Sequence, residues 1–138
     1  MKDLSLLVFR ILLVAIFPIS AYYKYIQWPG ITKPVTNAGL PFPEYLSMVG
    51  TAAEFSLPFF VILGLFTRWA ALGLIVYVLA ATYIGHPIWK VAPDAFFSNL
   101  MNFMKNAGMI GGLLVLTAFG PGRLAVRPSE IGGRHAEA

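Results

Sequence analysis

Four long apolar stretches constrain this chain more than any other feature of its sequence. They run from Leu4 to Trp28, from Phe42 to Phe66, from Trp69 to Gly85 and from Ala95 to Phe119. Each comes near the roughly 20 residues that a helix needs to cross a hydrocarbon layer of about 30 Å. They are too long for strands and lack the alternation of a strand with two different faces. Because backbone groups in lipid must be satisfied within the segment, the sequence predicts an all-α integral membrane four-helix transmembrane bundle.

The composition supports this interpretation. Of 138 residues, 58% are hydrophobic and only 12% are charged, which is too few polar side chains to cover a soluble globule. The length suits one domain. We expect residues 1–122 to form a four-helix membrane domain, because Gly120-Pro121-Gly122 would end the last helix, and residues 123–138 to form a cytoplasmic polar tail.

Charge and cysteine content exclude several classes of function. The net charge is +4, but the cations fall singly between apolar runs, so we predict no nucleic-acid partner. The chain has no cysteine, which excludes disulfides, thiolate catalysis and cysteine-bound metals. Of its two histidines, His135 lies in the tail, so no metal site and no haem pair is predicted within the crossings. The expected partners are the lipid bilayer, a protein of a membrane complex, and a second copy of the chain.

The distribution of lysine and arginine predicts the orientation. One side of the membrane would carry five basic residues and the other two, with Lys24 near its edge. The richer side holds Lys2, Arg68, Arg123, Arg127 and Arg134, and the poorer side Lys33 and Lys90. Both termini are therefore expected in the cytoplasm of a prokaryotic cell, with the chain in its inner membrane. A cleaved signal peptide is the alternative for the first stretch, which Arg10 interrupts.

Polar residues inside the spans are the candidate functional residues, because a charge at membrane depth needs a partner or water. They are Arg10, Glu54 and the adjacent Lys105 and Asn106. A rise of about 1.5 Å per residue places Glu54 about 18 Å and Lys105 about 21 Å from the cytoplasmic ends, and Arg10 about 9 Å. We therefore predict a Glu54–Lys105 salt bridge, with Arg10 reaching the same carboxylate and one positive charge left over.

Each of these residues also has a simpler interpretation. The charges could serve only to hold helices together. Arg10 could extend to the cytoplasmic interface. Lys24, among three tyrosines and Trp28, fits an interfacial belt, or else a polar pocket roofed by aromatic residues with His86 beside it. His86, which precedes a proline, could equally be an ordinary loop residue.

Glycines and prolines suggest how the helices pack. Gly108 and Gly112 form a GxxxG motif that would allow close helix contact, as would the small residues of the third stretch. Pro18 and Pro58 are expected to kink the first two helices. The long connection around residues 29–41 is expected to carry surface structure of its own.

Together these polar residues and glycines resemble the DoxX-like family of small membrane proteins. The motifs that carry the resemblance are Arg10, Phe17 and Lys24; Glu54, Gly64-Leu65, Thr67-Arg68 and Ala70-Ala71; and Lys105-Asn106, Gly111-Gly112-Leu113-Leu114 and Gly120-Pro121-Gly122. Val14 and Ala21 stand where the family usually has glycine, and Ala125 and Arg127 replace a usual Ser and Asp. The resemblance extends from about Leu4 to Arg127. It implies a polar core of Arg10, Glu54, Lys105 and Asn106, and relatives that are subunits of thiosulfate:quinone oxidoreductase or of other membrane redox assemblies.

Two functions follow as hypotheses. The first is a subunit supporting a membrane redox process, which binds a quinone-like or anionic ligand at Arg10, Glu54, Lys105, Asn106, Lys24 and His86, with a quinone as the one cofactor considered. The second is a non-catalytic anchor or assembly factor for a partner complex. A transporter is disfavoured, because the sequence shows no inverted repeat.

Overall fold

A computed structural model describes residues 2–126, and this part of the chain is all-helical. The helices are α1 (Lys2–Val14), α2 (Ile16–Ile26), the short 3-10 helix η1 (Gly30–Thr32), α3 (Lys33–Asn37), α4 (Pro43–Leu63), α5 (Thr67–Gly85) and α6 (Pro93–Phe119). Of the predicted polar tail, residues 123–126 are described, whereas residues 127–138, with Arg127, Arg134 and His135, lie outside the described residues.

Three segments are long and apolar enough to cross a membrane. They are the continuous pair α1–α2 (Lys2–Ile26), α4 and α5. Three of the four predicted spans therefore correspond to helices that could cross a membrane. α6 is the longest helix, but its first half carries Asn99, Asn102, Lys105 and Asn106, and it is not among those three.

Prolines act differently in the first two predicted spans. The first span is divided at Ala15, three residues before Pro18, in the turn whose i−4 hydrogen bond a proline cannot complete. Pro58, in contrast, lies inside α4, which continues without interruption to Leu63. The long connection around residues 29–41 forms η1 and α3, so it has secondary structure of its own, as predicted.

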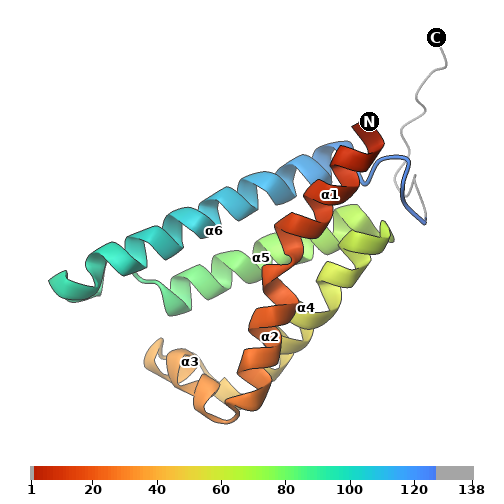
Figure 1. Ribbon diagram of the computed structural model, residues 1–138. Coiled ribbons are helices and arrows are strands. Elements are labelled where there is room, and N and C mark those ends of the chain that lie inside the picture. Colours follow the sequence, from red (N-terminus) through yellow and green to blue (C-terminus); the bar gives the residue numbers. More distant parts are fainter. Residues whose placement is uncertain (1, 127–138) are drawn as a thin grey trace.

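The start of α1 and the end of α6 lie at the same end of the molecule (Figure 1). The buried core includes Val14 at the end of α1 together with Val61, Leu74, Leu113 and Leu116, each fully buried. α1 crosses α6 at Gly112, where a Cβ atom would lie 2.7 Å from a Leu13 methyl carbon. A Cβ atom at Gly108 would have no neighbouring atom within 4 Å, so only Gly112 of the predicted GxxxG motif makes a close contact.

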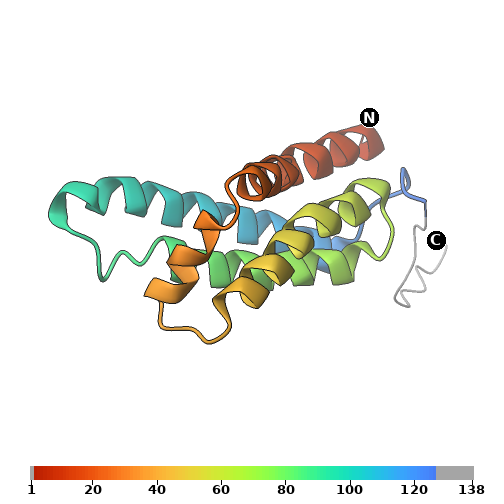
Figure 2. The ribbon, with the colours of Figure 1, turned by 90° about the horizontal axis from the view of Figure 1, so that it is seen from below.

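At the other end the helices diverge. Figures 1 and 2 show α2 and α4 turning away from α5 and α6, with α3 between them, and the first turns of α6 extending beyond the end of α5. The outer surface is covered by large apolar side chains, among them Leu12, Phe42, Val76 and Phe119. Such a surface is suited to lipid, and the diverging ends leave space inside the bundle.

Candidate functional site

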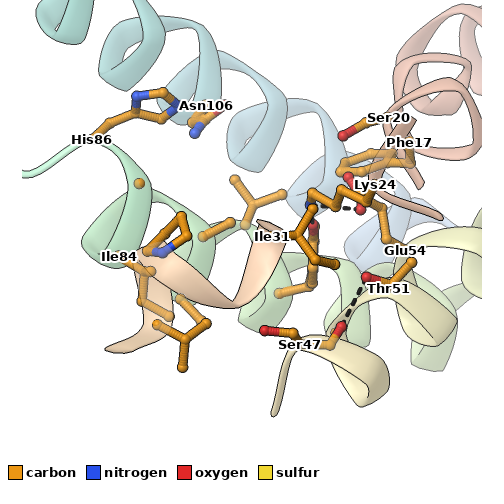
Figure 3. Close-up of a pocket in the computed structure, with 18 of the residues that line it drawn as sticks. Phe17, Ser20, Lys24, Ile31, Ser47, Thr51, Glu54, Ile84, His86 and Asn106 are labelled. Carbon is orange, nitrogen blue, oxygen red and sulfur yellow. Dashed lines mark hydrogen bonds and ion pairs between the residues drawn. The ribbon is translucent and has the colours of Figure 1, made fainter. Parts of the chain in front are cut away.

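A cavity of about 500 Å³ lies between the diverging helices. Its walls come from α2, α4, α5 and α6, and η1, α3 and Leu40 cover it (Figure 3). Most of the lining is apolar, including Phe17, Val35, Val78 and Met109. The polar lining residues are Ser20, Lys24, Ser47, Thr51, Glu54, Tyr77, His86, Lys105 and Asn106.

An ion pair between Lys24 and Glu54 forms the polar centre of one wall. Lys24 Nζ lies 2.7 Å from Glu54 Oε2 and donates a second hydrogen bond of 2.5 Å to the hydroxyl of Tyr77. The Glu54 side chain is only 4% exposed, whereas that of Lys24 is 35% exposed. The cluster therefore joins α2, α4 and α5, and both of its charged residues line the cavity, with the cation the more exposed of the two.

This arrangement corrects the predicted salt bridge. Glu54 and Lys105 do not pair, because Lys105 is exposed on α6 and donates to Asn102 Oδ1 at 3.0 Å instead. Matching depth was the basis for the prediction, and depth does not determine which way a side chain points around its helix.

Arg10 does not reach Glu54 either, so that prediction is also wrong. Its side chain is fully buried, which also contradicts the alternative that it extends to the interface. The guanidinium donates to the carbonyl oxygens of Val61, at 3.5 Å, and Leu124. It thus lies against the carboxyl end of α4, where the last carbonyls carry partial negative charge that a cation stabilises.

The segment after α6 completes this structural contact. Val126 N–H donates to Leu63 O, and Arg123 N–H donates to Asp3 Oδ1 at 3.4 Å. Gly64, with φ of +75°, has no room for a Cβ atom, which would lie 2.7 Å from Arg10 Nη1. Arg10 therefore joins α1, the end of α4 and residues 123–126, away from the cavity.

Lys24 and His86 line the same cavity, as in the pocket interpretation of Lys24. The predicted aromatic roof is wrong, however. Tyr22, Tyr23 and Tyr25 are exposed, and apolar residues of η1 and α3 cover the cavity instead.

The wall formed by α5 and α6 carries the remaining predicted residues. Asn106 is only 7% exposed, and its Nδ2 donates to Thr82 Oγ1 at 2.8 Å. His86 Nδ1 lies 3.4 Å from Asn99 Oδ1. Figure 3 shows His86 and Asn106 on the opposite side of the cavity from Lys24 and Glu54.

Sequence reasoning missed Tyr77 and Ser47. Tyr77 bonds the ion pair, and Ser47 is 8% exposed with a hydroxyl that has no hydrogen-bond partner within residues 2–126. Both hydroxyls lie in apolar helices. A search of the apolar stretches for neutral polar side chains as well as charged ones would have included them. The described residues contain no group of three metal-ligating side chains.

An all-helical membrane protein with an internal, mainly apolar cavity is the class defined by this fold and site. The DoxX family model matches residues 5–87, more than half of the chain, and the chain belongs to the DoxX family. This confirms the resemblance seen in the sequence, although the family match ends before α6. The chain is also 33% identical to the inner membrane protein YphA of Escherichia coli (strain K12) over 125 residues, which cover 91% of this chain and 89% of that protein. No solved structure matches the chain.

Proposed function

We propose that the protein is a membrane subunit that supports a redox process by binding a quinone-like ligand in the cavity. The observation that carries the proposal is a lysine held by a buried carboxylate and a phenol on an otherwise apolar wall. Cavities of about 300–1,000 Å³ with apolar walls and a few polar groups are typical of small-molecule sites. The cavity lies within this range.

The chemistry of the cluster fits an acceptor oxygen. A lysine ammonium has three donor hydrogens, and Glu54 and Tyr77 accept two of the hydrogen bonds. The third is free to donate to a quinone carbonyl. Glu54 neutralises the ammonium and, in this proposal, keeps it directed into the cavity or exchanges a proton with the ligand. Asn106 and Lys105 would offer donors from the opposite wall. Arg10 has no part in the proposed site, because it faces the end of α4.

A structural role is the second candidate. The Lys24–Glu54–Tyr77 cluster connects three helices, which favours an anchor or assembly factor whose polar groups only fix the bundle. A ligand-binding measurement on folded variants distinguishes the two candidates.

The arrangement of the chain in the membrane is part of this proposal. We propose that α6 is a fourth crossing, that the protein lies in a prokaryotic inner membrane with both termini cytoplasmic, and that it acts with a protein partner or a second copy. The inner membrane location is supported by the name of the E. coli relative. The exposed apolar helix surfaces support contact with the lipid bilayer.

Decylubiquinone provides the test. The wild-type protein in neutral detergent should bind it saturably, as measured by quenching of the intrinsic tryptophan fluorescence, and should unfold at a higher temperature in its presence. Lys24→Gln should weaken binding by about tenfold or more, because it removes a charged donor. Lys33→Gln is the matched control, since Lys33 is exposed on α3 and does not line the cavity.

Two results would overturn the proposal. One is the absence of saturable quinone binding to a folded wild-type protein. The other comes from native membranes, where Lys24→Gln/Glu54→Gln should lower quinone-dependent electron transfer. A folded double variant with full activity would leave only the structural role.

A further inference from the structure

The α5–α6 wall of the cavity has a positive charge that forms no ion pair with an acidic residue of the described chain. Lys105 lines this wall, and its bond to Asn102 is made to a neutral amide. Within the described part of the chain the one ion pair is Lys24–Glu54. Since the carboxylate of Glu54 is already engaged by Lys24, the charge of Lys105 remains uncompensated beside the cavity. A cation in an apolar setting favours an anionic partner.

Neutral donors accompany this charge. Thr82 donates to Val78 O at 2.6 Å and accepts from Asn106 Nδ2, which fixes the amide of Asn106 on the cavity wall. One Nδ2 hydrogen then remains for a ligand. His86 is held through Nδ1 by Asn99, whose own Nδ2 donates to Ala95 O at 3.0 Å. Because His86 uses its Nδ1–H for Asn99 Oδ1, the oriented donors that this wall offers are the Asn106 amide and the Lys105 ammonium group.

Lys105 both lines the cavity and is exposed at the surface of the molecule. The same cavity is also lined by the apolar residues Met109, Phe17 and Val78. The small side chains of Ala80 and Ala81 leave room along α5. A molecule with one charged end and one apolar chain would match a cavity that combines the Lys105 ammonium group with mainly apolar walls.

We infer that Lys105 and Asn106 form a second subsite, which binds the anionic head group of a single-chain amphiphile whose chain occupies the cavity. The inference rests on the proposed function in that the cavity is a ligand site, but it uses the wall opposite Lys24. The head group is a carboxylate or a phosphate ester, and both have oxygens that accept from an ammonium and an amide.

Binding of cis-parinaric acid, a fluorescent fatty acid, tests this inference. The protein in neutral detergent should enhance its fluorescence saturably. Dodecanoate and dodecyl phosphate should displace it, whereas dodecanol, which has the same chain and no charge, should displace it poorly. A stronger effect of dodecanoate assigns the site to free fatty acids, and a stronger effect of dodecyl phosphate assigns it to phosphate-bearing lipids.

Lys105→Gln should weaken cis-parinaric acid binding by about tenfold or more, and Lys33→Gln should leave it unchanged. Thermal unfolding without ligand provides the fold control: Lys105→Gln should unfold cooperatively at the wild-type temperature, because Lys105 is exposed and bonds only to Asn102 of its own helix. Equal fatty acid affinity in wild type and Lys105→Gln, or equal displacement by dodecanol and dodecanoate, would overturn the inference. Quinone binding without fatty acid binding would refute the subsite alone, and fatty acid binding without quinone binding would refute the proposed function alone.

Discussion

Removing one partner of the Lys24–Glu54 pair should destabilise the bundle unequally, depending on which partner is removed. Lys24→Met leaves a carboxylate that is 4% exposed without its cation, which should cost about 3–5 kcal/mol. Glu54→Gln leaves an ammonium on a side chain that is 35% exposed, where water can solvate it and Tyr77 still accepts, so the cost should be about 1 kcal/mol.

The double variant should cost about 1–3 kcal/mol less than the sum of the two single variants, because neither charge is then left alone. Equilibrium unfolding by SDS in mixed micelles measures all four free energies of unfolding. A loss of 3 kcal/mol changes the unfolding equilibrium by more than about 100-fold, well within the range of the method.

Lys33→Met and Glu44→Gln form the matched control cycle. Both side chains are exposed, and neither has an ion pair in the described structure, so each change should stay within about 0.5 kcal/mol. The reasoning is refuted if Lys24→Met costs no more than Lys33→Met, or if the Lys24–Glu54 cycle is additive to within about 0.3 kcal/mol.

Three further predictions follow from the packing and the topology. Gly112→Leu should cost about 1–3 kcal/mol in SDS unfolding, because α1 crosses α6 there, whereas Gly108→Leu should be nearly neutral; equal effects would contradict the packing. Arg10→Met should cost about 2–3 kcal/mol and speed proteolysis of the segment after α6, because the carbonyls of Val61 and Leu124 lose their donor; unchanged proteolysis would refute this role. The natural chain has no cysteine, so Lys90→Cys and Arg123→Cys can be labelled singly in intact cells. An impermeant maleimide should label only the cysteine at position 90, and labelling of both positions would refute α6 as a crossing.

The apolar stretches were sufficient to predict the helices. Lipid imposes a length and a uniform apolarity on a span, and both can be counted along a chain, so α4 and α5 begin and end within about three residues of the predicted stretches. α6 is the exception. It is long enough to cross a membrane, but its polar first half makes it less apolar than the other three segments.

The pairing of polar side chains could not be predicted in the same way. A count along the chain places Glu54 and Lys105 at a similar depth, but contact also requires that both helices turn these residues toward each other, which depends on packing. Packing at Gly112 holds α1 against α6, whereas α2 diverges from α6 and leaves a cavity between Lys24 and Lys105. Arg10 shows the same limit, because its carbonyl partners lie 51 and 114 residues away along the chain.

Native mass spectrometry of the protein released directly from its own membrane tests most directly whether the cavity holds a lipophilic ligand through Lys24. The wild-type protein should retain a small lipophilic molecule, identifiable by its mass, that folded Lys24→Gln loses and Lys33→Gln keeps. Identical bound masses in all three proteins, or no bound molecule in the wild type, would contradict the account.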